Sequence, residues 1–140
     1  MQDINSEQDI KNLVDSFYNK VNSDPLLGPV FNEVAKVDWD EHLPKMYTFW
    51  STLLFRTMTY RGQPLPKHLV LPVKQEHFER WISLFCATVD ELFSGDKAKE
   101  AKNYALSIAD TFQTRMGIFN PFLFKHSTGG KANPLKVTAL

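Results

Sequence analysis

The sequence of 140 residues contains a single cysteine, Cys86, and this near absence excludes several kinds of site. One cysteine forms no internal disulfide and builds no cysteine-ligated zinc or iron–sulfur centre. Because Cys86 lies beside the apolar face of a predicted helix, we interpret it as a small core residue rather than a nucleophile. An excess of charge is also missing, since Lys plus Arg and Asp plus Glu number 16 each. This balance gives no indication of binding to nucleic acid or to a membrane surface.

Long apolar runs and glycine-rich motifs are missing as well. No segment approaches the roughly 20 apolar residues of a membrane span, and the polar, acidic N-terminus is unlike a signal peptide. The chain has no phosphate-binding glycine loop, no nucleophile elbow, and no His–Glu spacing typical of zinc proteases or di-iron bundles. We therefore expect a cytoplasmic protein with no membrane or nucleic-acid partner.

Large apolar side chains are abundant, since 43% of the residues are hydrophobic and 11 are phenylalanine. This content, at this length, predicts one folded domain with a proper core. We place the domain at residues 1–126. Residues 127–140 contain Gly129, Gly130 and Pro134 and no helical stripe, so we expect them to form a mobile tail.

Apolar residues recur at helical spacing in four long stretches, and no stretch alternates as a strand does. The predicted helices begin after Ser6, near Asp38, around Lys74 and after Gly95. A short helix is expected near Val30. The predicted fold class is therefore all-α, with at least one long irregular connection.

The second long helix contains a proline, Pro44, which a helix tolerates in its first turn. This preference predicts that the helix starts just upstream, near Asp40 or Glu41.

Three prolines frame a histidine in the middle of the chain. Pro64 and Pro66 precede His68, and Pro72 follows it. Each proline fixes its own backbone and disfavours helix before it, yet leucine and valine surround His68. A stiff, apolar segment with one imidazole must either pack the ring or offer it something to bind.

Three further polar groups lie on apolar helical stripes, namely Tyr18, His42 and Trp81. Each alone is more often an ordinary core residue. Together with His68 they indicate a ligand pocket with apolar walls and a few placed polar groups. Two histidines on opposed elements, with aromatic rings between them, fit a flat apolar cofactor better than a small metal ion. His77, four residues before Trp81, is a rival ligand, and His126 is expected to be exposed.

Four segments in the same order resemble one known family. They are residues 16–21, 24–31, 39–50 and 60–81, of which the last is the most specific. Over residues 5–120 the chain resembles a truncated haemoglobin of group III. The resemblance implies a truncated globin fold, a two-over-two helical sandwich around haem b.

The resemblance also implies roles for individual residues. His68 corresponds to the proximal iron ligand, and Tyr18, His42 and Trp81 correspond to the distal pocket. The further haem contacts it implies are Phe31, Phe49 and Met46, with Lys45 and Lys67 for the haem propionates. The chain departs from the family's pattern in the tail beyond Phe124 and in Pro44, close behind His42.

The function implied is reversible binding of dioxygen, and of NO and CO, at a five-coordinate, histidine-ligated iron. Tyr18 and Trp81 would donate hydrogen bonds to the ligand and slow its escape, while His42 would control access. An alternative is a haem enzyme that performs nitric oxide dioxygenation or peroxide chemistry with an external reductase. A third class is a haem-free helical interaction domain. We expect a monomer.

Overall fold

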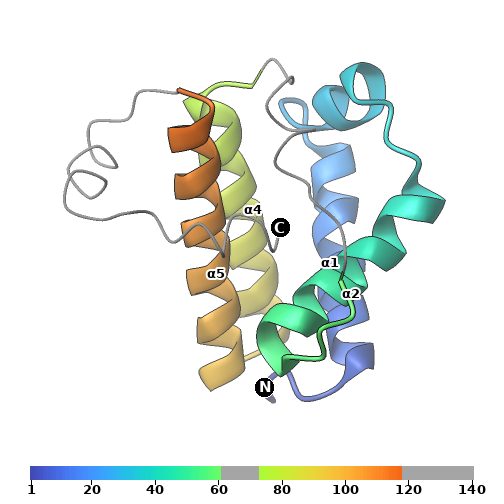
Figure 1. The fold of residues 1–140 in the computed structure, drawn as a ribbon, viewed down its shortest axis with the longest axis vertical. Coiled ribbons are helices and arrows are strands. Elements are labelled where there is room, and N and C mark those ends of the chain that lie inside the picture. The colour runs from blue at the N-terminus through green and yellow to red at the C-terminus, as the bar shows by residue number, and fades with distance from the viewer. Residues whose placement is uncertain (61–72, 118–140) are drawn as a thin grey trace.

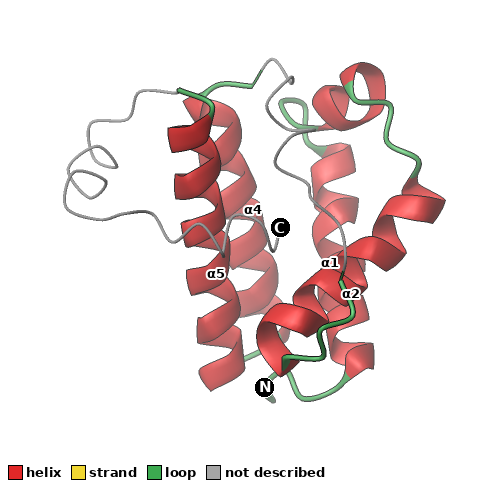
Figure 2. Cartoon of the chain, in the orientation of Figure 1, coloured by secondary structure: helices red, strands yellow, loops and turns green. Residues whose placement is uncertain are grey.

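The computed structural model describes residues 1–60 and 73–117, and these residues fold as helices without any strand. The helices are α1 (Glu7–Ser23), a short π-helix η1 (Val30–Val34), α2 (Trp39–Phe55), α4 (Gln75–Leu92) and α5 (Asp96–Arg115) (Figure 2). The predicted all-α class is confirmed. Within the same residues, no helix is both long and apolar enough to cross a membrane.

The helices form two pairs that face each other (Figure 1). In one pair α2 crosses α1, and in the other α4 and α5 run antiparallel, side by side. Helix α1 also packs on α4, and α2 packs on α5, so the two pairs close around a shared interior. This is the predicted two-over-two arrangement.

The first two long helices begin where side chains can satisfy their free backbone N–H groups. The hydroxyl of Ser6 accepts a hydrogen bond from the Asp9 amide at 3.1 Å, as the sequence predicts. The carboxylate of Asp38 accepts one from the Glu41 amide at 3.4 Å.

Pro44 lies further into its helix than predicted. Because Asp38 is the cap, α2 begins at Trp39 rather than at Asp40 or Glu41, and Pro44 falls inside the helix, in its second turn. A proline has no N–H to donate to the carbonyl four residues earlier, which here belongs to Asp40. The helix continues across this position to Phe55.

Aromatic rings fill the interior between the two helix pairs. Phe17, Phe49 and Phe85 are essentially inaccessible to solvent. Phe85 stacks on Trp50 with ring centroids 4.8 Å apart, and it meets Phe17 edge-on at 5.1 Å. Since these residues come from α1, α2 and α4, this aromatic cluster joins both pairs.

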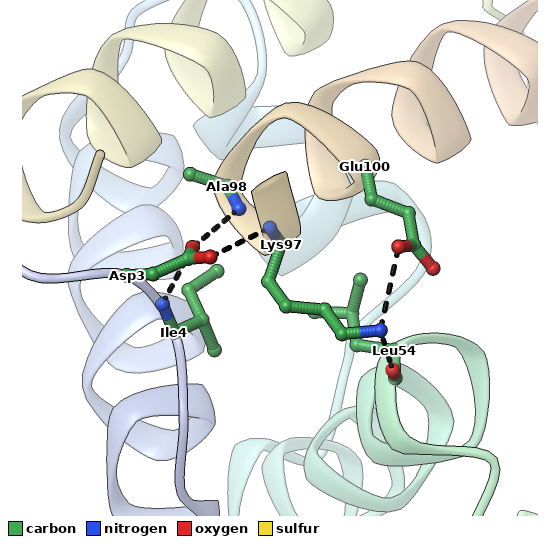
Figure 3. Close-up of polar contacts among 6 residues, drawn as sticks. All are labelled: Asp3, Ile4, Leu54, Lys97, Ala98 and Glu100. Carbon is green, nitrogen blue, oxygen red and sulfur yellow. Dashed lines mark hydrogen bonds and ion pairs between the residues drawn. The ribbon is translucent and has the colours of Figure 1, made fainter. Parts of the chain in front are cut away.

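The N-terminal segment supplies the cap that α5 lacks. Gly95 stands at the cap position and has no side chain to offer. The carboxylate of Asp3 instead accepts hydrogen bonds from the amides of Lys97 and Ala98, both at 2.8 Å (Figure 3). The ammonium of Lys97 donates to the Leu54 carbonyl at 2.8 Å. We call these four residues, Asp3, Lys97, Ala98 and Leu54, the N-terminal clamp, because they join the start of the chain to α5 and α2.

Candidate functional site

A cavity lies between the two helix pairs and receives side chains from every helix in the described parts of the chain. Its empty volume is about 870 Å³ when the space out to its open mouth is counted. The walls are mainly apolar and aromatic. The lining residues are Tyr18, Leu27, Val30, Phe31, His42, Met46, Phe49, Trp50, Val73, His77, Phe78, Trp81, Ile108, Ala109 and Phe112.

Tyr18 brings a hydroxyl from α1 into this apolar cavity. The side chain is buried, with 7% of its surface exposed. Burial raises the pKa of Tyr18 far above its usual value, and the nearby Tyr60 hydroxyl adds to the effect. The hydroxyl therefore stays protonated at any physiological pH and can donate a hydrogen bond.

His42 faces Tyr18 from α2. Its Nε2 lies 3.5 Å from the Tyr18 hydroxyl, at the long limit of a hydrogen bond. The two rings meet edge-on, with centroids 5.4 Å apart. The structure thus brings together two of the residues that the sequence predicts for the distal pocket.

Two residues with no predicted role, Trp39 and Asn32, support the pair formed by Tyr18 and His42. The indole N–H of Trp39 donates to the Asn32 side-chain oxygen at 2.8 Å, and the Trp39 ring packs on Tyr18 at 5.2 Å. Asn32 lies in η1, where the sequence predicts only a short helix, and it also donates to the Gly28 carbonyl at 3.0 Å. Trp39 is visible in the sequence as part of an apolar face, but nothing there pairs it with Asn32.

Trp81 lines the cavity from α4, opposite the helix that carries Tyr18. Its ring stacks on Phe85 at 5.9 Å and meets Phe17 edge-on at 5.6 Å. The aromatic cluster of the core therefore fixes the indole, while its half-buried surface borders the cavity.

The other residues predicted to contact haem divide into three groups. Phe31, Phe49 and Met46 line the cavity. Lys45 is exposed, pairs with Glu41 at 2.9 Å and is not among the lining residues. His68, Lys67 and His126 lie outside the described residues, so the roles given to His68 and Lys67 stay predictions.

His77, the rival ligand, also lines the cavity and is half-buried. Its Nδ1 accepts a hydrogen bond from the backbone amide of Lys74 at 2.9 Å, so the side chain caps the first turn of α4. When Nδ1 of a neutral imidazole accepts a hydrogen bond, the single ring proton is on Nε2. That protonation state leaves no nitrogen lone pair on Nε2 to coordinate iron.

A buried carboxylate, which sequence reasoning missed, ties the cavity walls together. Asp24 accepts hydrogen bonds from the amides of Leu26 and Leu27 at 3.0 and 2.9 Å. It also pairs with the Arg80 guanidinium at 3.1 Å. Leu27 lines one wall, and Arg80 precedes Trp81 on another. The residue looks like a helix stop in the sequence, because its partner Arg80 is 56 positions away.

These features define a class of protein. Broad aromatic walls and a few polar groups, set between two helix pairs, suit a flat apolar cofactor better than a free metal ion. The chemistry of the lining therefore fits haem, and the fold is that of a small haem-binding helical protein of the globin type.

Comparison with known proteins identifies the family. Residues 2–116 match the bacterial-like globin family. The chain is 36% identical over 115 residues to the group 3 truncated hemoglobin ctb of Campylobacter jejuni, covering 79% of this chain and 91% of that one. The crystal structure of the group III truncated hemoglobin from Campylobacter jejuni is similar at a TM-score of 0.74 and 36% identity, covering 83% of this chain and 95% of that chain.

This chain belongs to the bacterial-like globin family, among the group III truncated haemoglobins. The predicted fold and family are confirmed. Membership of a globin family implies a haem cofactor.

Proposed function

We propose that this globin reversibly binds dioxygen, and other diatomic ligands such as NO and CO, at a haem b iron held by His68. Tyr18 and Trp81 hold the ligand, and His42 controls its access. One observation carries the proposal, namely that these three side chains reach one apolar cavity from three different helices. Few polar groups border the cavity, so each has a large effect on what binds there.

The iron ligand that we propose is His68. When bound, haem would supply an iron that takes up a small diatomic ligand, and one imidazole of this chain would hold that iron. The hydrogen bond from the Lys74 amide occupies Nδ1 of His77, so the ring proton is on Nε2. His77 is therefore a weaker candidate than His68 for the iron ligand. This favours His68, the other histidine for which the sequence predicts iron binding.

Tyr18 and Trp81 are the proposed donors to the ligand. The pKa of Tyr18, raised by burial, keeps its hydroxyl protonated, and Trp81 has an indole N–H that can only donate. The separation of 3.5 Å between Tyr18 and His42 makes their mutual bond weak, so the hydroxyl can turn to a ligand at little cost. In an apolar cavity such hydrogen bonds are stronger than in water.

His42 is the proposed access residue. It is half-buried and packs edge-on against both Tyr18 and Trp39, with ring centroids 5.4 and 5.5 Å away. A ring at that place can obstruct the path between solvent and cavity. Phe31, Phe49 and Met46 form the apolar walls against which we expect the porphyrin to pack.

Absorption spectra test the proposal. We expect the purified protein, given one equivalent of haemin and then reduced, to show a five-coordinate high-spin ferrous spectrum that CO shifts at one CO per chain. Failure to retain haem would reject the proposal, and so would a six-coordinate ferrous form that excludes CO.

A further inference from the structure

Among the described residues that border the cavity, His77 has no role in the proposed ligand chemistry. It comes from the first turn of α4, one helical turn before Trp81 on the same helix. Its Nδ1 is engaged by the Lys74 amide at 2.9 Å. The neutral ring therefore presents an N–H donor on Nε2, on the edge of the ring opposite the helix cap.

A donor fixed in this way suits an anionic acceptor. Haem carries two carboxylates on one edge of an otherwise apolar ring system, and burying a carboxylate without a partner is strongly unfavourable. Lys45, predicted for this role, is exposed and paired with Glu41. In the parts of the chain that the structure describes, His77 is the better placed donor, because its ring borders the cavity.

We infer that His77 is a haem-positioning residue whose Nε2–H donates a hydrogen bond to a carboxylate of the cofactor. The Lys74 amide selects the tautomer by occupying Nδ1. The start of α4 therefore determines which ring nitrogen can donate to the haem. This inference rests on the proposed function, since the acceptor belongs to haem. It assigns His77 to the carboxylate edge of the cofactor and not to its iron.

Two substitutions that keep the helix cap isolate the donor. In both His77→Glu and His77→Gln the side chain can accept the Lys74 amide, as Glu and Gln commonly do at this helix position. Gln keeps an N–H group, whereas Glu has none and repels a carboxylate. The helix should therefore survive in both variants, and only the contact with the anion should differ.

The experiment measures the rate at which ferric haem leaves each protein for an excess of apomyoglobin. With native haem, we expect the His77→Glu protein to lose the cofactor roughly tenfold faster than wild type or more, because one charge-assisted hydrogen bond is gone. The His77→Gln protein should lie between them. With haem dimethyl ester, whose carboxylates are blocked, all three proteins should lose the cofactor at similar rates.

Three outcomes would overturn the inference. Equal loss of native haem from wild type and His77→Glu would show that the donor contributes nothing. An equal increase with the ester would show that His77 acts through packing. A changed axial ligation in the ferrous spectrum of His77→Glu would make His77 an iron ligand. If wild type itself takes up no haem, the proposed function falls together with this inference, whereas the first three outcomes leave haem binding intact.

Discussion

Tyr18 combines a buried ring with a hydroxyl that cannot ionise at physiological pH, and its long contact to His42 leaves that hydroxyl available. The substitution Tyr18→Phe removes only the hydroxyl and keeps the volume of the ring. We expect dioxygen to dissociate about 10 to 100 times faster from the haem-loaded variant, for a charge-assisted bond of about 1.5–3 kcal/mol. Stopped-flow displacement of dioxygen by CO measures this rate.

Trp81 provides the matched comparison. Trp81→Phe should also speed dissociation, in part because the smaller ring leaves space beside Phe85 and Phe17. Because both donors serve one ligand, the double variant should fall short of the product of the two single effects. Wild-type dissociation rates in both single variants would mean that Tyr18 and Trp81 are core packing only.

We expect His42 to affect the rate of ligand association more than the rate of dissociation. His42→Leu keeps a side chain of similar reach but removes the polar ring that faces Tyr18 and Trp39. We expect the association rate of CO to change severalfold, while dioxygen dissociation changes less than it does in Tyr18→Phe. Flash photolysis of the CO complex gives the association rate. A change confined to dissociation would assign His42 to ligand stabilisation instead of access.

The sequence predicts that these three residues line one pocket, because three polar groups on three apolar stripes are less ordinary than one, and all three line the cavity. It was not sufficient for Asn32 or for the cap made by His77. Asn32 acts through one bond to Trp39, seven residues away in a segment without periodicity. The role of His77 depends on which ring nitrogen meets the Lys74 amide, and spacing does not encode that choice.

At the scale of the elements, local signals placed the helices well. Ser6 caps α1 as predicted, and α4 begins one residue after Lys74. The cap of α5 could not be predicted from the local sequence, since the capping carboxylate of Asp3 is 94 positions from the Lys97 amide. No short window of sequence contains both partners.

We expect the N-terminal clamp to contribute to the free energy of unfolding through the carboxylate of Asp3. Partial burial tends to raise the pKa of Asp3, but hydrogen bonds from the Lys97, Ala98 and Ile4 amides outweigh it and lower the pKa below its usual value. The substitution Asp3→Asn keeps the shape and removes the charge. We expect the free energy of unfolding at pH 7 to fall by about 1 kcal/mol, because Asn has one acceptor oxygen and leaves one of the two amides of α5 without its hydrogen bond.

The pH dependence follows from the sign of the pKa shift. A carboxylate whose pKa is lower in the folded state contributes stability above its unfolded pKa and loses it as pH falls through the folded value. The gap between wild type and Asp3→Asn should thus stay constant from pH 7 to about pH 4 and narrow below it. Urea unfolding across this range measures the gap. The control is Asp96→Asn, which removes a charge at the same end of α5. If this variant loses as much unfolding free energy as Asp3→Asn, then Asp3 is not a specific helix cap.

At the scale of the whole molecule, long-range polar links hold two helix pairs around one cavity. The Asp24–Arg80 pair joins the turn after α1 to α4, and Lys97 joins α5 to the end of α2. The sequence predicts the two-over-two arrangement through its family resemblance. It does not reveal these links, because each depends on residues brought together only by the fold.

The sequence predicts that residues 127–140 form a tail outside the domain, and these residues lie outside the part of the chain that the structure describes. We expect a chain that ends at residue 126 to keep the haem absorption and the thermal unfolding midpoint of the full chain. The physical reason is that residues 127–140 offer no apolar stripe to bury. Thermal unfolding of both haem-loaded proteins makes the comparison. A midpoint lowered by several degrees would mean that the tail packs on the helices.

The central claim is that haem is held through His68, and one substitution tests it most directly. His68→Gly should lose haem on gel filtration and regain it, with a wild-type-like ferrous spectrum, when free imidazole is added to fill the vacated position. His77→Ala should keep histidine-ligated iron without imidazole. The opposite pattern, with haem retained in His68→Gly and histidine ligation lost in His77→Ala, would contradict the account.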